Sequence, residues 1–136
     1  MKVRMLILLA VASCSPTSPK NNPIGDVRGI QWELYQYAGT TGVITIVPNT
    51  MHFRFLLVSQ PDSIWGLSNC NDFSGHYTLK ENQLSDTLFT ESLGCPLTEE
   101  FKNALENATI QASDSASLQM QSTDQTMTEL WFKRAN

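Results

Sequence analysis

The sequence predicts an α+β fold: a single domain in which a curved antiparallel β-sheet of about seven or eight strands packs around one α-helix. Short segments that alternate apolar and polar residues recur from residue 27 to the end of the chain, and turn-forming residues separate them. One segment instead repeats its apolar residues at spacings of three and four. A lone helix with an apolar stripe must bury that stripe, so a sheet curled around it is the simplest arrangement.

The first predicted strand spans residues 29–39, and its aromatic and aliphatic side chains suit a pleated surface. One face carries Ile30, Trp32 and Leu34, and the other carries Glu33, Tyr35 and Tyr37. Four further strands are predicted before the helix, at residues 43–47, 51–57, 73–79 and 84–90, and residues 64–67 lead into the stretch at residues 66–77.

The helical segment lies within "CPLTEEFKNALENA", residues 95–108. Its apolar positions fall on one face: Leu97, Phe101, Ala104, Leu105 and Ala108. Pro96 suits a first helical turn, and Glu99 and Glu100 sit where the helix dipole favours negative charge. Strands are predicted again at residues 108–113, 116–121 and 126–134, the last two joined as a hairpin.

The N-terminal residues predict export. Lys2 and Arg4 precede an eight-residue apolar run, Met5–Ala12. A membrane-spanning helix needs about 20 apolar residues, so this run is too short to span a membrane. We therefore interpret residues 1–13 as a signal peptide. Without Lys2 and Arg4 the formal net charge falls from −4 to −6, and no basic stripe remains. This balance argues against a nucleic-acid partner.

The end of the apolar run resembles a bacterial lipobox, in which one aliphatic and two small residues precede a Cys: Val11, Ala12, Ser13 and Cys14. This resemblance implies a mature chain that begins at a lipidated Cys14 and is anchored to a membrane of the cell envelope. Ser15 favours the outer membrane, on its periplasmic or surface face. Residues 14–26, rich in Pro, Ser and Asn, predict a flexible tether, and residues 27–136 predict the folded domain. Ordinary secretion with cleavage nearby is the alternative.

The stretch "GLSNCNDFSGHY", residues 66–77, holds the residues most suggestive of chemistry. A thiol nucleophile would use Cys70 or Cys95 with His76 as base, but an oxidising compartment favours a disulfide over thiolates. A zinc site of these Cys with His76 and His52 lacks the close ligand pairs of structural zinc. With Cys14 lipidated, Cys70 and Cys95 remain as a candidate pair. No catalytic residue, metal ligand or cofactor is predicted.

Aromatic and apolar residues offer one further kind of site. Tyr35 and Tyr37 lie on the face opposite Trp32, and "VITIV" at residues 43–47 has no polar face. Part of the surface is therefore apolar enough to dock a ligand or a partner.

The chain resembles the META domain family, also called HslJ-like. The resemblance rests on "W-x-L" at Trp32 and Leu34, on Pro48 and Phe53, on "G-x-x-x-C-N-x-F-x-G-x-Y" at Gly66, Cys70, Asn71, Phe73, Gly75 and Tyr77, on Cys95, Glu100, Phe101 and Leu105, and on "L-x-F-x-R" at Leu130, Phe132 and Arg134. Two positions depart from the family pattern: Asn69 stands where a Gly usually precedes the Cys, and Glu91 where a Thr is usual.

This resemblance implies a small α+β fold with a sheet around a helix, export from bacteria, frequent lipoprotein forms and links to heat or antibiotic stress. It supplies no catalytic residues. The roles it implies are structural: Asn71 and Gly75 shape the turn, and Cys70 with Cys95 cross-links that turn to the start of the helix.

The leading hypothesis is a non-enzymatic envelope lipoprotein with a binding or stress-related role. It would contact the membrane through its N-terminal lipid and have a further protein or small-molecule partner. One alternative is a small-molecule or peptide carrier that uses a cleft in the sheet. Another is a cryptic Cys-dependent hydrolase or inhibitor.

Overall fold

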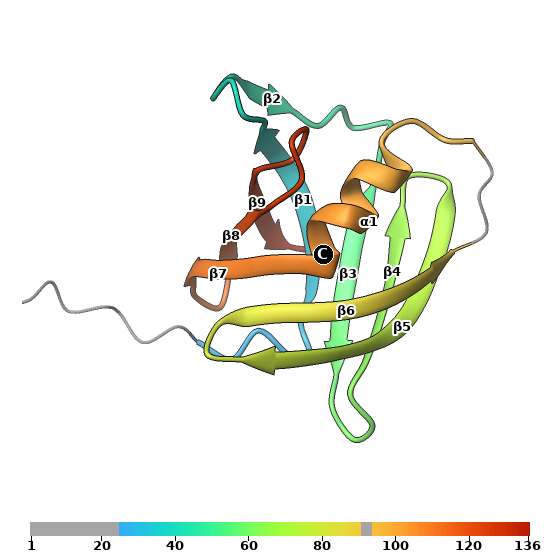
Figure 1. Cartoon of the computed structure of the whole chain (residues 1–136), viewed down its shortest axis with the longest axis vertical. Coiled ribbons are helices and arrows are strands. Elements are labelled where there is room, and N and C mark those ends of the chain that lie inside the picture. The colour runs from blue at the N-terminus through green and yellow to red at the C-terminus, as the bar shows by residue number, and fades with distance from the viewer. Residues whose placement is uncertain (1–24, 91–93) are drawn as a thin grey trace, which may run out of the picture.

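A computed structural model describes residues 25–90 and 94–136 of the chain. The predicted signal peptide, Cys14, the tether up to residue 24 and Glu91 lie outside the described residues. Nine strands and one helix are present in the described part (Figure 1). They are β1 (Gln31–Ala38), β2 (Ile44–Ile46), β3 (Phe53–Val58), β4 (Ser63–Ser68), β5 (Asn71–Lys80), β6 (Gln83–Thr90), α1 (Thr98–Glu106), β7 (Asn107–Ser113), β8 (Ser117–Ser122) and β9 (Glu129–Arg134).

Eight of these strands close a barrel. The hydrogen-bonded order runs β1-β3-β4-β5-β6-β7-β8-β9, every pair is antiparallel, and β9 pairs back with β1 (Figure 1). The prediction of an antiparallel sheet with one helix is therefore confirmed, but the sheet is closed rather than only curved. Closure removes the exposed edges that an open sheet would present. The ninth strand, β2, is added to the outside of this ring by its pairing with β1.

β1 divides one of its edges between two partners. Its first part, residues 31–33, pairs with β3, and its last part, residues 36–38, pairs with β2. A β-bulge interrupts its register with β9 between Leu34 and Gln36. The bulge adds a residue, so the side chains beyond it change faces. Tyr37 consequently lies opposite Leu130 and packs against the core. The prediction that Tyr37 shares the outer face with Tyr35 was wrong for this reason.

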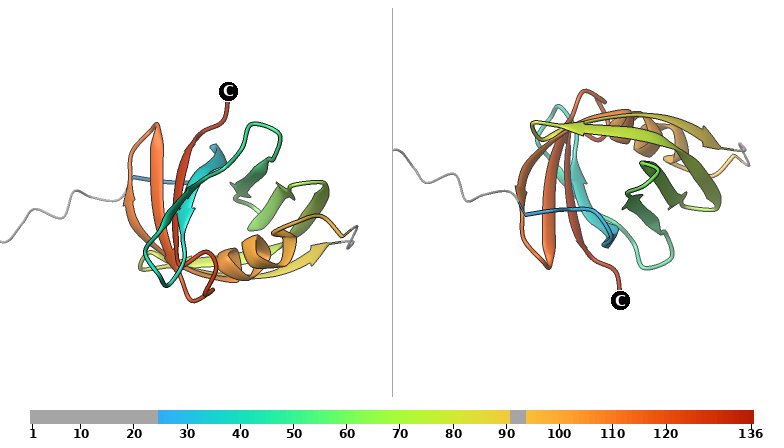
Figure 2. Two further views of the ribbon diagram at one scale, coloured as in Figure 1. Left: turned by 90° about the horizontal axis from the view of Figure 1, so that it is seen from above. Right: turned by 90° about the horizontal axis from the view of Figure 1, so that it is seen from below.

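Helix α1 covers one end of the barrel and lies alongside β6 (Figure 2). Its Phe101 ring is fully buried and packs against the rings of Phe53, Phe73 and Phe132, with centroids 5.2, 6.1 and 6.3 Å away. Burying a Phe side chain contributes about 1.5–3 kcal/mol. Phe101, Ala104 and Leu105 of the predicted stripe are confirmed on α1. Leu97 precedes the helix with a φ of 62°, and Ala108 lies on β7, so the helix is shorter than residues 95–108.

The core is drawn mainly from the barrel strands and the helix, and Val27 before β1 and Met127 between β8 and β9 complete it. Its cluster of buried residues runs along the chain from Val27 to Phe132. Trp32 lies in it with an exposed fraction of 0% and donates its indole N–H to the carbonyl of Val27 at 3.0 Å. Every core residue in the described part of the chain lies between Val27 and Phe132, so a chain without residues 1–14 keeps all of them.

Candidate functional site

The Asn- and Cys-rich stretch is a tight hairpin. Ser68, the last residue of β4, pairs with Asn71, the first residue of β5, so Asn69 and Cys70 alone make the turn. Asn69 has a φ of 62°, in the left-handed region that Asn tolerates better than most residues. This conformation explains why Gly or Asn suits the position.

A disulfide and a buried hydrogen-bond network fasten this turn to the start of α1. Cys70 and Cys95 form the disulfide, with their Cα atoms 6.0 Å apart. The hydroxyl of Ser68 donates to the carbonyl of Thr98 at 3.2 Å, and the hydroxyl of Thr98 donates to the carbonyl of Ser68 at 3.2 Å. The amide of Asn71 donates to the Thr98 hydroxyl at 3.1 Å. Ser68, Cys70 and Asn71 of this stretch therefore hold the turn to the start of α1.

The apolar residues of the same motif have packing roles. A Cβ on Gly66 would collide with the ring of Phe73 and the carbonyl of Arg54, so the Phe73 ring occupies the space above this glycine. A Cβ on Gly75 would collide with the carbonyl of Thr87 on β6. Tyr77 is buried, and its hydroxyl accepts a hydrogen bond from the Nε of Arg28 at 3.1 Å.

The disulfide argues against both the thiol-nucleophile and the zinc-site interpretations of Cys70 and Cys95. A sulfur bonded to another sulfur is neither a thiolate nucleophile nor a zinc ligand in this state. His76 lies five residues along β5 from Asn71, a separation of about 16 Å at the usual rise of a strand. The structure therefore does not bring His76 to the sulfurs as a catalytic pair. Within residues 25–90 and 94–136, no three His, Cys, Asp or Glu side chains gather where they could hold a metal ion.

A different region forms a cleft. Between its pairing with β3 and with β2, β1 is flanked by the connecting segment 47–52, and a cleft of about 510 Å³ opens there. This volume is within the usual range for small-molecule sites. The backbone N–H of Val47 donates to the carbonyl of Tyr35 at 3.0 Å and fixes the segment over β1. We call this hollow the β1–β2 cleft.

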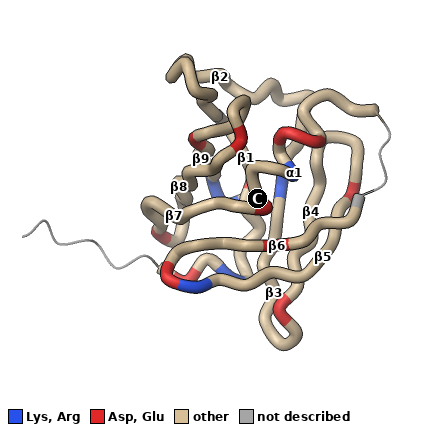
Figure 3. The backbone as a smooth tube through the Cα atoms, in the orientation of Figure 1, with Lys and Arg blue, Asp and Glu red and all other residues tan. Residues whose placement is uncertain are grey.

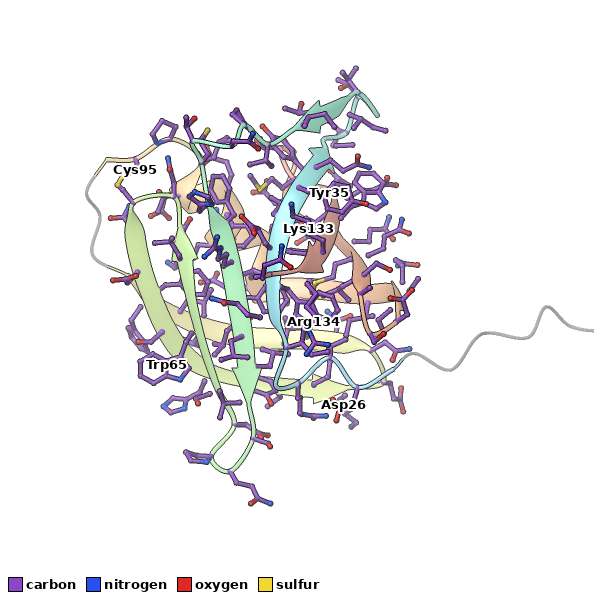
Figure 4. All side chains as sticks on the ribbon, turned by 180° about the vertical axis from the view of Figure 1, so that it is seen from behind. Asp26, Tyr35, Trp65, Cys95, Lys133 and Arg134 are labelled. Atoms are coloured by element: carbon purple, nitrogen blue, oxygen red, sulfur yellow. A yellow bond between two sulfur atoms is a disulfide. The ribbon has the colours of Figure 1, made fainter. Side chains whose placement is uncertain are left out.

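Positive side chains concentrate in the β1–β2 cleft. The described residues include six Lys and Arg, and three of them, Arg54, Lys133 and Arg134, line it. They also include twelve Asp and Glu, of which Glu33 alone lines the cleft. The other acidic positions are scattered over β5, β6, α1, β9 and the turns and loops between elements (Figure 3). Tyr35, Lys133 and Arg134 lie along β1 and β9 on one side of the molecule, with Cys95 well away from them (Figure 4).

Glu33 occupies the floor of the cleft between cations from neighbouring strands. It lies opposite Arg54 on β3 and opposite Lys133 on β9. Its Oε1 is 3.0 Å from Nδ1 of His52 and accepts a hydrogen bond from Nη2 of Arg54 at 3.4 Å. Burial alone would raise the pKa of Glu33, but the hydrogen bond with His52 and the charges of Arg54 and Lys133 outweigh burial and hold the pKa below its usual value. Glu33 is therefore ionised at neutral pH.

The opposite wall of the cleft is apolar. Ile46, Val47, Pro48 and Met51 line it, and Tyr35 adds an aromatic ring that is 37% exposed. Val47 and Met51 pack against the core, whereas Ile46 is 63% exposed. The sequence pointed to Tyr35 and the apolar segment 43–47 as a docking surface, but it did not connect them with the three cations. Lys133 and Arg134 come from the other end of the chain, and only the β1–β9 pairing brings them here.

The β1–β2 cleft can therefore hold a small molecule between a cationic wall and an apolar one. Charges in a cleft with low-dielectric walls act more strongly than the same charges on an open surface. In the described part of the chain, no helix is long and apolar enough to cross a membrane.

Comparisons with known proteins agree with the fold. The family model for the META domain matches residues 25–135. The NMR structure of the protein from Burkholderia xenovorans superposes with a TM-score of 0.64 at 20% sequence identity, covering 90% of this chain and 99% of that one. At this identity the likeness concerns the fold alone. None of the curated proteins matches this chain.

Proposed function

This chain belongs to the META domain family, and we propose that it is a non-enzymatic binding protein of the bacterial cell envelope. In this proposal a lipid on Cys14 holds the protein at the membrane, and the β1–β2 cleft is its ligand site. The role in envelope stress that the family resemblance implies would be exercised through that ligand.

The observation that carries the binding proposal is the composition of the cleft. It gathers half of the described Lys and Arg residues beside an apolar wall, in a protein whose formal net charge is −4. Structure formation does not require such a concentration, because like charges close together repel one another. By contrast, the motif residues Cys70 and Asn71 are already used in fastening the turn to Cys95 and Thr98 at the start of the helix.

The anchor is supported by the N-terminal sequence. An apolar run that ends in Val11, Ala12, Ser13 and Cys14 precedes a Pro- and Ser-rich segment. Several acyl chains, each worth about 0.8 kcal/mol per buried methylene, hold a protein on a membrane far more firmly than one chain does.

Metabolic labelling with an alkyne analogue of palmitate tests the anchor. The wild-type chain should carry the label and sediment with membranes, and Cys14→Ser should lose the label. Ser13→Ala is the matched control, because it keeps a small residue before the Cys and should stay labelled. A wild-type protein that is exported without label would refute the anchor.

A binding assay tests the site. The chain without residues 1–14 can be incubated with a bacterial envelope extract and examined by native mass spectrometry for a bound small molecule. A ligand that is retained by the wild type and lost in the pair Lys133→Gln and Arg134→Gln supports the β1–β2 cleft. A ligand that both proteins retain equally would place the site elsewhere.

A further inference from the structure

The two walls of the β1–β2 cleft differ in chemistry, and this difference restricts the ligand. Arg54, Lys133 and Arg134 offer N–H donors and positive charge on one side. Ile46, Val47 and Met51 offer only hydrocarbon and a thioether on the other. A ligand that satisfies both walls must itself have a polar anionic part and an apolar part.

The charge balance fixes the sign of the polar part. Among the described residues that line the cleft, the charged side chains are three cations and Glu33. Glu33 already accepts a hydrogen bond from Arg54. The lining cations therefore outnumber the one lining side-chain carboxylate by two. Lys133 lies opposite Glu33 in the sheet, whereas the neighbouring Arg134 donates a hydrogen bond to the carbonyl of Ser115 at 3.4 Å. A carboxylate or phosphate would complement them, because charge-assisted hydrogen bonds to such groups are among the strongest in proteins.

The exposed apolar residues at β2 are the reason to expect an apolar part in the ligand. This strand pairs with β1 alone among the described strands, and Val43, Ile44 and Ile46 are 68%, 54% and 63% exposed. Covering such apolar surface contributes about 25 cal/mol per Å². Ile46 borders the cleft directly, so an apolar group bound beneath β2 would cover part of this surface.

We propose that the β1–β2 cleft binds a small amphiphilic anion, in which a carboxylate or phosphate head contacts Lys133, with Arg134 adding positive charge nearby, and an attached hydrocarbon group lies against Ile46, Val47 and Met51. This inference rests on the proposed function, because it names the ligand class of the same site. The head could belong to a free fatty acid or alkyl phosphate, or to a lipid within a bilayer. We assign the free amphiphile, since a head within a bilayer would not place its chain inside a cleft of about 510 Å³.

Calorimetric titration of the chain without residues 1–14 tests the ligand class with four soluble probes. Decanoate and decyl phosphate should bind. Inorganic phosphate, which lacks the chain, should bind at least about tenfold more weakly than decyl phosphate, and decyltrimethylammonium, which reverses the charge, should not bind. Equal binding of decyltrimethylammonium and decanoate would overturn the anionic part, and equal binding of the two phosphates would overturn the apolar part.

Variants separate the two walls. The double variant Lys133→Gln, Arg134→Gln should weaken decanoate binding about tenfold or more, which corresponds to about 1.4 kcal/mol. Ile46→Ser should weaken decanoate and leave inorganic phosphate unchanged. Lys80→Gln, which removes a β5 cation outside the cleft lining, is the matched control and should bind like the wild type. Unchanged decanoate affinity in the double variant would refute the proposed contacts.

A vesicle experiment distinguishes the source of the head group. Binding to phosphatidylglycerol vesicles without any response to the soluble anions would overturn the inference, because recognition would then occur at a bilayer surface. The outcome also separates this inference from the proposed function. If the β1–β2 cleft retains a neutral or cationic molecule from the envelope extract, the binding function stands and the ligand class is wrong.

Discussion

Asn71 and Thr98 meet in the interior although 27 positions separate them in the chain, and the Asn71 amide donates a hydrogen bond to the Thr98 hydroxyl at 3.1 Å. The Thr98 hydroxyl in turn donates to the carbonyl of Ser68. The Cys70–Cys95 disulfide joins the same two segments covalently. The most distinctive stretch of the sequence thus holds the β4–β5 turn against the start of α1.

Replacing Asn71 tests this structural role. Asn71→Ala removes the buried donor to Thr98, and the change should lower the free energy of unfolding by about 1–3 kcal/mol. Urea denaturation of the oxidised protein measures the loss. Asn69→Gly is the control, because Gly adopts the same positive φ without strain, and it should change stability much less. Similar losses in the two variants would argue against the buried hydrogen bond as the cause.

The disulfide should contribute to stability without contributing to ligand binding. In the chain-entropy model, a loop of this length, with its cysteines 25 positions apart, is worth roughly 3.5 kcal/mol. The pair Cys70→Ala and Cys95→Ala should therefore lower the urea midpoint and leave the decanoate affinity of the folded protein unchanged. A variant that stays fully folded but no longer binds would show that the sulfurs belong to the site.

Asp86 should make stability fall as pH rises toward neutrality. Both of its carboxylate oxygens are buried without a hydrogen-bond partner in the described structure. Burial, and then the charge of Glu106, raises the pKa of Asp86 from 3.8 to about 8. Between about pH 4 and pH 8 the unfolded chain therefore binds fewer protons at this position than the folded chain, so stability decreases as pH increases.

The variant Asp86→Asn should remove most of that decline, because an amide stays neutral in both states. The measurement is the free energy of unfolding in urea at several pH values from 4 to 8. Asp62→Asn, which changes an exposed acid in the β3–β4 turn, is the control and should keep the wild-type slope. A slope that Asp86→Asn leaves intact would assign the pH dependence to other groups.

Glu33 should weaken the binding of anions at the β1–β2 cleft. It is the carboxylate on the cleft floor and, because its pKa is lowered, it is ionised at neutral pH. Glu33→Gln removes that negative charge and releases the Arg54 guanidinium from its carboxylate partner. The affinity for decanoate should rise severalfold in the same calorimetric titration. A fall in affinity would mean that Glu33 contacts or positions the ligand favourably.

The helix and most strands could be predicted because their patterns are local. Phe101, Ala104 and Leu105 fall on one helical face, and the structure buries all three. The alternation of Trp32 and Leu34 likewise placed these side chains inside. Tyr37 was misplaced because a bulge shifts the alternation, and a bulge leaves no mark in the apolar pattern itself. The closure of the barrel was missed since the pairing of the first and last barrel strands is a non-local contact.

The candidate site was only half predictable for the same reason. Tyr35 and residues 43–47 were recognised as an apolar surface, because their character is visible in a short stretch of sequence. Arg54, Lys133 and Arg134 reach them from β3 and β9, and nothing local connects these three cations. The concentration of positive charge therefore became visible only when the strands were assembled.

Residue-by-residue NMR mapping of decanoate binding tests the central claim most directly. In a ¹⁵N–¹H titration of the chain without residues 1–14, the backbone amides of Tyr35, Ile46, Lys133 and Arg134 should shift with a common dissociation constant. The amides of Asn69, Asn71 and Cys95 should stay in place. Shifts that cluster at the Asn69–Cys70 turn and the start of α1, with the β1–β2 cleft unperturbed, would contradict the account.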